Sequence, residues 1–331
     1  MKKNLFLISV AALAFAACSN DTTVEQNTTV NQPKEIAFSP LVQPNTRAAV
    51  DGTTFTPTTM QVAAWDVTNS RDFFTATTFT KDATTWKGGK YWPFSAAYIN
   101  FLAYTGLDLN VVGNSQSWDI LDDETSQAAS GVTLVMANNS STQNDLMYAI
   151  GHGEVTFNSS TNALGFPANV PMTFMHAQAW VKFTVKAGDE TSASAITVNS
   201  ITLNSVSCAG TYTVTHTNYN ATSGQSVAGV WSEYAIGEGN YPAVAASGYS
   251  ALTTSVQDYA SLMVVPNKGM ASFTINYTLD GNTYNYTYTP ASTTLAQAYK
   301  YTYNITLTVH EIEIAPSVTN WTEGGPTAVN L

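Results

Sequence analysis

The chain has 331 residues, of which 12 are Lys or Arg and 23 are Asp or Glu, so its formal net charge is −11. An acidic surface repels phosphate backbones and anionic headgroups, which excludes a nucleic-acid partner and leaves no basic patch for membrane binding. Only 11% of residues are charged, and Thr, Ser, Asn, Tyr and Val are abundant, so we expect an all-β (mainly β) fold whose sheets have a solvated face.

The N-terminus has the features of a bacterial lipoprotein signal. Lys2 and Lys3 precede an apolar run, Leu5–Ala17, that is too short to span a bilayer, and Cys18 follows directly. We expect residues 1–17 to be removed and Cys18 to carry the lipid that holds the precursor in a membrane. The alternative is a secreted protein that is cut near Ala17 and carries no lipid.

Residues 18–47 are expected to form a tether and a removable first strand. The tether is Ser19–Gln32, which is rich in Thr, Asn and Gln and is typical of a flexible linker. Ile36 and Phe38 then alternate with smaller residues, which predicts a short strand that ends at Pro40.

Arg47 is one of only two arginines in the chain, and it lies among turn formers and small residues in the segment Gln43–Gly52. Segments of this kind stay exposed to proteases. A cut between Arg47 and Ala48 would detach Cys18–Arg47 as one piece, together with the lipid and the first strand. The alternative is an ordinary surface arginine in a loop.

Period-two alternation predicts strands along most of the remaining chain. These expected strands are Gln61–Val67, Tyr98–Tyr104, Val132–Ala137, Val181–Ala187, Ile196–Asn204, Tyr212–Thr217, Ser261–Val265, Ala271–Leu279, Thr283–Tyr288 and Tyr301–Val309. Asp280-Gly281 predicts a tight hairpin turn between two of them, because glycine tolerates the left-handed dihedrals of such a turn. Helical periodicity is confined to short candidates at Ile120–Ala129 and Thr293–Ala298.

The chain is long for a single sandwich, so we expect two domains. Turn formers without alternation fill Asn158–Met172 and place the boundary there, which gives an N-terminal β-sandwich over 48–165 and a C-terminal one over 166–331. After the flexible segment Thr322–Gly325, the tail carries Thr327, Val329 and Leu331 on one face of an extended strand. This face could fill an apolar groove as a donor strand, and the alternative is a frayed terminus.

The sequence offers poor material for an enzyme. The four histidines, His152, His176, His216 and His310, are far apart, and no phosphate-binding loop or nucleophile turn occurs. His152 lies between two glycines and is expected in a turn, and Cys208, the other cysteine, is expected to be a small core residue. We therefore expect no catalytic residue, no metal site and no cofactor.

Several segments, in their order, resemble the fimbrillins of Bacteroidia, the subunits of protease-assembled (type V) pili. The segments are Lys34–Phe38, Asn45–Ala48, Trp86, Tyr91–Pro93, Ile99–Tyr104, Asp145–Ala149, Phe174–His176, Val181–Val185, Tyr301–Leu307, Ile312–Ile314 and Val318–Trp321. The resemblance implies two tandem transthyretin-like β-sandwich domains and a structural subunit of a cell-surface fimbria that supports adhesion. Within that family, a cleavable first strand together with a donor tail favours a stalk-type subunit.

The resemblance also implies how such a subunit assembles. An Arg-specific protease would release the first strand of the outer-membrane lipoprotein, and a C-terminal strand of a neighbouring pilus subunit would replace it. A host or bacterial surface receptor would be a further partner. Seven tryptophans and 17 tyrosines raise the alternative of a lipid-anchored glycan-binding module or a tip adhesin, which would stack sugars on exposed rings. The family pattern implies that the Tyr-Trp-Pro and Val-x-x-Trp aromatics are buried.

Overall fold

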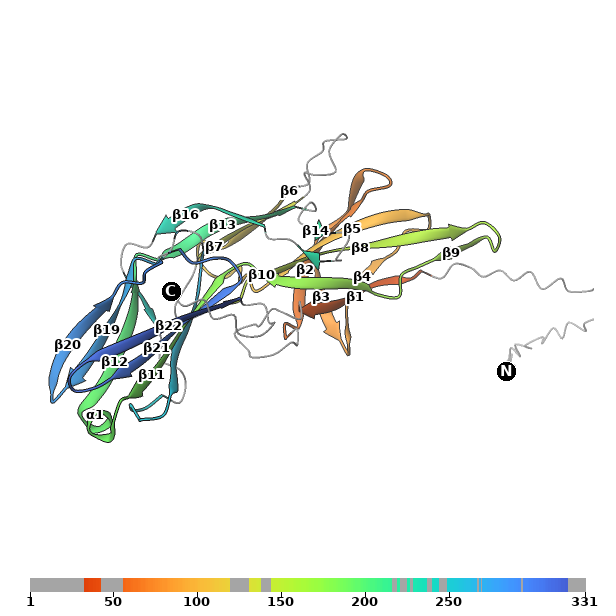
Figure 1. Ribbon diagram of the computed structural model, residues 1–331. Helices are drawn as coiled ribbons and strands as arrows, with labels where there is room; N and C mark the ends of the chain where they lie inside the picture. Colours follow the sequence, from red (N-terminus) through yellow and green to blue (C-terminus); the bar gives the residue numbers. More distant parts are fainter. Residues whose placement is uncertain are drawn as a thin grey trace, which may run out of the picture. The chain divides into compact units, whose positions relative to one another are not determined.

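The structure is a computed structural model that describes residues 33–42, 56–119, 131–137, 144–215, 219–220, 225–226, 229–236, 240–243, 249–266, 268, 270–292 and 294–320. Within these ranges the chain is almost entirely β, with one short helix, α1 (Glu190–Ala195). No helix in the described ranges is both long and apolar enough to cross a bilayer. The all-β prediction is therefore confirmed (Figure 1).

The largest sheet has the strand order β10-β1-β4-β3-β2-β5-β8-β9, and β10 also pairs with β8, so this first sheet closes on itself. Its strands are β1 (Glu35–Val42), β2 (Thr59–Asp66), β3 (Arg71–Asp82), β4 (Thr85–Tyr91), β5 (Ala97–Thr105), β8 (Met147–Asn158), β9 (Ala163–Gly165) and β10 (Val170–His176). Apolar side chains from most of these strands fill the interior of the closed sheet, among them Phe38, Phe79, Phe101, Trp92 and Phe174.

A second sheet combines strands that are far apart in the sequence, in the order β16-β13-β7-β6. Its strands are β6 (Ser115–Asp119), β7 (Gly131–Ala137), β13 (Ser207–Thr215) and β16 (Val230–Ile236). Tyr212 and Trp231 of this sheet share a core with Leu102, Tyr104 and Tyr148 of the first sheet. The paired segments 101–105 of β5 and 147–151 of β8 are therefore covered on both faces, which accounts for the continuous burial of their side chains. The second half of β8 is largely exposed.

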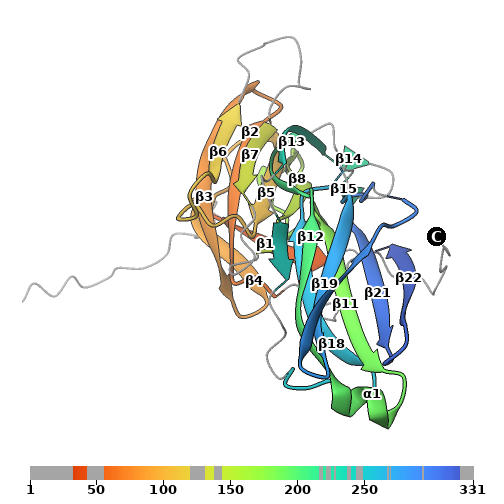
Figure 2. The same ribbon diagram turned by 90° about the vertical axis from the view of Figure 1, so that its left-hand side faces the viewer.

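The C-terminal part is a sandwich of two sheets, in which β11, β21 and β22 lie side by side (Figure 2). One sheet has the order β18-β11-β21-β22, with β11 (Ala179–Ala187), β18 (Gln257–Val264), β21 (Tyr299–Leu307) and β22 (Ile312–Asn320). The other has the order β17-β12-β19-β20, with β12 (Ile196–Asn204), β17 (Asn240–Ala243), β19 (Ser272–Leu279) and β20 (Asn282–Tyr288). Between the two sheets, the Phe273 ring packs edge-to-face against Phe183 and Tyr303, and the Phe183 and Tyr303 rings are stacked. A short pair, β14 (Tyr219–Asn220) and β15 (Gln225–Ser226), completes the described strands.

Each strand predicted from alternation is present in the described part of the chain, and the Asp280-Gly281 turn joins β19 to β20 as expected. The end of the expected strand Tyr212–Thr217, from His216 on, and the helix expected at Ile120–Ala129 lie outside the described residues. Both turn residues have positive φ, 49° for Asp280 and 79° for Gly281. The helix predicted at Thr293–Ala298 is wrong. Leu295 and Ala298 are buried there by loop packing, and the φ of 58° at Ala298 is incompatible with a right-handed helix.

The boundary expected after residue 165 falls between β9 and β10, although β10 pairs with both β1 and β8 of the first sheet. Strand pairing of this kind makes β10 part of the N-terminal body, so we propose that the N-terminal sandwich extends to His176. The segment Asn158–Met172 is rich in turn formers, but its last residues already belong to β10.

Candidate functional site

The candidate site is the position of β1 inside the closed first sheet. β1 pairs in antiparallel fashion with β4, with Phe38 opposite Trp86, and in parallel fashion with β10, with Phe38 opposite Val170. It is thus an internal strand, even though it stands first among the described strands of the chain. In Figure 1 it lies beside β4 and β10.

The apolar side chains of β1 are part of the core. Ile36 and Phe38 are both 0% exposed. The Phe38 ring makes edge-to-face contacts with Phe79 and Phe101, at centroid distances of 4.8 and 5.0 Å. Removal of β1 would therefore leave an apolar groove in the core of this sheet.

Polar contacts hold the start of β1. The Glu35 Oε1 atom accepts a hydrogen bond of 3.1 Å from the Gly89 backbone N–H, and the Lys34 carbonyl accepts one of 2.9 Å from the Trp92 N–H. Without β1, the facing backbone groups of β4 and β10 would lose their partners. Unpaired N–H and C=O groups on both sides of a groove are what an incoming strand can satisfy.

The prediction that the first strand ends at Pro40 is wrong, since β1 continues to Val42. Its pairing with β4 stops at Phe38, whereas its pairing with β10 continues through Pro40, opposite Met172. Proline lacks an N–H and is tolerated where one side of a strand has no ladder partner. The strand predicted from Ile36 and Phe38 is therefore longer than expected.

The other predicted assembly residues lie outside the described residues, namely Cys18, Arg47, Ala48, Thr327, Val329 and Leu331. The second arginine, Arg71, is placed: it begins β3 opposite Asp66, and its Nε atom lies 3.4 Å from Asp66 Oδ2. Arg71 is thus part of a paired strand.

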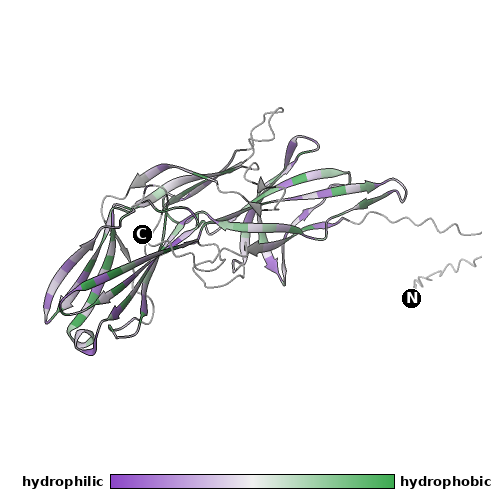
Figure 3. Cartoon of the chain, viewed as in Figure 1, coloured by the Kyte–Doolittle hydropathy of each residue, from purple (hydrophilic) through white to green (hydrophobic). Residues whose placement is uncertain are grey.

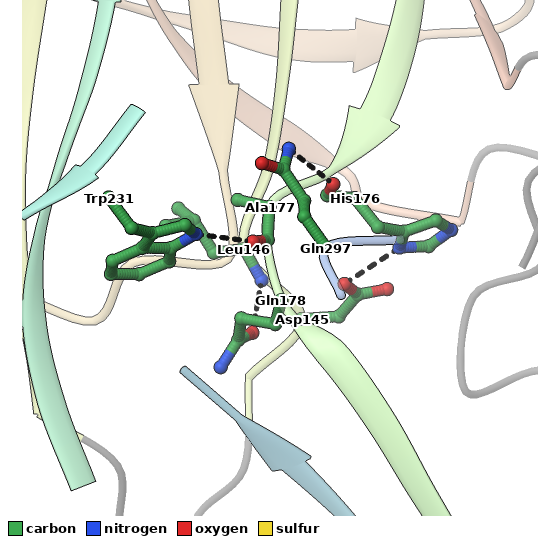
Figure 4. Close-up of polar contacts among 7 residues, drawn as sticks. All are labelled: Asp145, Leu146, His176, Ala177, Gln178, Trp231 and Gln297. Carbon is green, nitrogen blue, oxygen red and sulfur yellow. Dashed lines mark hydrogen bonds and ion pairs between the residues drawn. The ribbon is translucent and has the colours of Figure 1, made fainter. Parts of the chain in front are cut away.

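A polar cluster holds the segment between β10 and β11, as Figure 4 shows. His176 Nδ1 lies 2.8 Å from Asp145 Oδ1, and the Leu146 N–H donates to Gln178 Oε1 at 3.0 Å. Side chains from other sheets and loops also reach this segment. Trp231 Nε1 donates to the Ala177 carbonyl at 2.6 Å, and Gln297 Nε2 donates to the His176 carbonyl at 3.1 Å.

A histidine beside a carboxylate can also be part of a catalytic site. His176, however, is 0% exposed, and a general base must reach the proton that it abstracts. This burial makes His176 a packed structural residue. The cluster also contacts Tyr212, whose hydroxyl accepts from Gln297 Nε2 at 2.7 Å. Burial raises the pKa of the neighbouring Tyr148 to about 12, so both phenols stay neutral near pH 7.

The expectation of a turn around His152 is wrong, because His152 lies within β8 opposite Asn100 and stacks on Tyr98. The flanking glycines have a packing reason instead. A Cβ on Gly151 would lie 2.4 Å from Met172 Sδ, and one on Gly153 would lie 2.4 Å from Trp92 Cη2. Both glycines let buried side chains approach β8 closely.

A metal site and a glycan site each require particular side chains. The described ranges contain no group of three or more His, Cys, Asp or Glu side chains that could hold a metal ion. Sugar stacking requires exposed rings, but four of the tryptophans are buried to 4% exposure or less, namely Trp86, Trp92, Trp180 and Trp231. These tryptophans are therefore unavailable for glycan binding.

The comparisons with known proteins agree with the fold. The chain is similar in structure to a candidate cell adhesion protein from Bacteroides uniformis, with 16% identity, a TM-score of 0.53 and coverage of 87% of this chain and 98% of the other. A candidate cell adhesion protein from Bacteroides ovatus has 14% identity, the same TM-score of 0.53 and coverage of 88% and 99%. At these identities the similarity shows the fold alone. None of the curated proteins matches the chain.

The family is shown by the sequence itself, because a family model described as fimbrillin-like matches residues 46–321. That match begins one residue before Arg47 and ends at Trp321, so it spans all the strands described above except β1. The chain therefore belongs to the fimbrillin-like family and is a structural protein of cell-surface fimbriae rather than an enzyme.

Proposed function

We propose that the chain is a stalk-type fimbrial subunit that is exported as a lipoprotein, cut after Arg47 and polymerised by strand exchange. The observation that carries this proposal is the position of β1. It is an internal strand with buried Ile36 and Phe38, and it precedes Arg47 in the sequence. A cut after Arg47 therefore separates a strand of the core from the rest of the chain.

The energetics require a replacement strand. Burial of a large apolar side chain stabilises a fold by about 1.5–3 kcal/mol, so loss of both Ile36 and Phe38 would be costly. A donor strand from a second subunit offsets this cost if its apolar residues have the same two-residue spacing. Val329 and Leu331 have that spacing, and Thr327 lies on the same face of an extended strand, which supports the C-terminal tail as the donor.

The lipid gives the precursor its location. Cys18 would hold the precursor at the outer membrane, and the cut would release the subunit from the lipid when its groove becomes available. In this account the partners are an Arg-specific protease and neighbouring pilus subunits. A receptor on host or bacterial cells would be reached by the assembled fimbria.

The chain provides a matched control, since Arg47 and Arg71 are its only arginines. The exported protein is incubated with an Arg-specific protease and polymer formation is followed by electron microscopy and by gel analysis. We expect Arg47→Ala to abolish polymers. Arg71→Ala should still polymerise, because Arg71 is held in a paired strand. Polymer formation by Arg47→Ala, or an uncleaved wild type, would contradict the proposal.

A further inference from the structure

Strand β20 leaves one edge of the C-terminal sandwich open. It pairs with β19 along its whole length in unbroken register, from Leu279 opposite Asn282 to Phe273 opposite Tyr288. Among the strands that the structure describes, β20 has no second neighbour. All of its residues except Tyr288 are exposed, and Figure 3 shows the strand without hydrophobic colouring.

The other edges of this sandwich carry features that discourage pairing with a further strand. β17 is only four residues long and contains Pro242, and β22 contains Pro316 and Glu313. β18 contains Asp258, next to a register irregularity in β11. Prolines, charges, bulges and short length are the usual means of protecting a sheet edge. β20 has none of them.

The outward backbone groups of β20 follow from its register. Residue pairs in an antiparallel ladder alternate between hydrogen-bonded and non-bonded kinds, and the pair that closes a two-residue turn is hydrogen-bonded. Here the closing pair is Leu279 and Asn282. Backbone N–H and C=O groups of Thr283, Asn285 and Thr287 therefore point away from β19.

The sequence of this edge reads the same in both directions. Thr283-Tyr284-Asn285-Tyr286-Thr287 is a palindrome centred on Asn285. A two-fold antiparallel pairing of two copies would place Asn285 opposite itself, Thr283 opposite Thr287, and Tyr284 opposite Tyr286. Each outward backbone group would then meet its partner, and each side chain would meet one of its own kind.

Side-chain ladders already run toward this edge. Asn199 Nδ2 donates to Asn276 Oδ1 at 2.8 Å, and Asn276 Nδ2 donates to Asn285 Oδ1 at 2.7 Å. On the other face, the rings of Tyr277 and Tyr284 are stacked at 5.7 Å. Asparagine ladders and stacked aromatic rings stabilise successive strands of the same sequence. A second copy would extend both ladders by one strand.

We propose that β20 is a self-association edge, through which two copies of this chain pair side by side in antiparallel fashion. This contact goes beyond strand exchange along a fimbria, because it uses neither β1 nor the C-terminal tail and would join subunits laterally. The edge itself is uncharged, whereas the whole chain carries −11. Association should therefore strengthen as added salt screens the repulsion between copies.

The test uses the protein exported by its own signal with Cys18→Ser and Arg47→Ala, so that neither lipid nor strand exchange contributes. Asn285→Cys is added, since the Cα atoms of a hydrogen-bonded antiparallel pair lie about 5.5 Å apart, within the range of a disulfide. After mild oxidation we expect a disulfide-linked dimer. Thr283→Cys and Thr197→Cys should form no disulfide-linked dimer, because neither residue would face itself across the two-fold axis.

A second variant tests the contact without a covalent link. Asn285→Lys places two like charges opposite each other and should raise the dissociation constant about tenfold or more in analytical ultracentrifugation. Thr197→Lys, on an exposed position of β12 away from the edge, should leave it unchanged, and circular dichroism checks the fold of each variant. The proposal is overturned if the three cysteine variants cross-link equally, if Thr283→Cys is the one that dimerises, or if Asn285→Lys associates like its parent.

Discussion

Phe38→Ala in the uncleaved protein measures how much the first strand contributes to the core. Phe38 is 0% exposed and its ring contacts Phe79 and Phe101 edge-to-face. Truncation of a buried phenylalanine costs about 3–5 kcal/mol, and each aromatic contact contributes about 0.5–1.5 kcal/mol beyond area burial. Because two such contacts are lost, we expect a value near the upper end of the first range.

The assay is guanidinium unfolding followed by tryptophan fluorescence, which reports on Trp86 and Trp92 in the same core. Phe157→Ala is the matched control, since Phe157 lies in β8 of the same sheet but is 54% exposed; its free energy of unfolding should change by about 0.5 kcal/mol or less. A loss below about 1 kcal/mol for Phe38→Ala would refute the reasoning that β1 is an integral strand of the core.

Three further predictions concern the packing around this sheet and its junction with β11. Gly153→Ala should destabilise the fold by about 1–3 kcal/mol, because the added Cβ would lie 2.4 Å from Trp92 Cη2; an unchanged melting temperature would argue against that contact. Trp231→Phe should cost about 1–3 kcal/mol, because it removes the buried donor to the Ala177 carbonyl; urea unfolding that matches the wild type would contradict this. Burial raises the pKa of Tyr148 from 10.0 to about 12. The stability that the neutral, buried phenol contributes to the fold is therefore fully present below pH 10 and is lost between about pH 10 and 12. That loss amounts to roughly 3 kcal/mol and should be smaller in Tyr148→Phe; equal stability of the wild type at pH 8 and pH 12 would show that the phenol is not buried in this way.

The strands of the C-terminal sandwich could be predicted because their signals are local. β19, the turn at Asp280-Gly281 and β20 follow one another along the chain, and alternation with a glycine-containing turn identifies such a hairpin directly. The short helix α1 was missed. Its cap, the Asp189 side chain that accepts from the Ser192 N–H, is a recognisable start signal, but six residues are too few to show helical periodicity.

The surroundings of β1 could not be predicted because they depend on distant residues. Strand β10 contains Pro171 and follows a turn-rich segment, so the sequence does not indicate that it pairs with β1. β4 contains Gly88, which interrupts the alternation of apolar and polar residues. A glycine stands there because a Cβ would lie 2.9 Å from the Phe79 ring. The pairing of β7 with β13 joins the two halves of the chain in one sheet. No local pattern identifies such partners.

The same sequence features that identify Ile36 and Phe38 as a strand therefore become informative about assembly only once β1 is seen between β4 and β10. A first strand at the edge of a sheet could be lost with little effect. An internal strand with two fully buried side chains leaves a groove that requires a replacement.

The most direct test of this account is N-terminal sequencing of the subunit in fimbriae sheared from the cell surface. The account predicts that the sequence begins at Ala48, since the lipidated Cys18 and β1 would have been removed together. A sequence that begins at a residue before β1, or an N-terminus blocked by lipid at Cys18 in the assembled form, would contradict it.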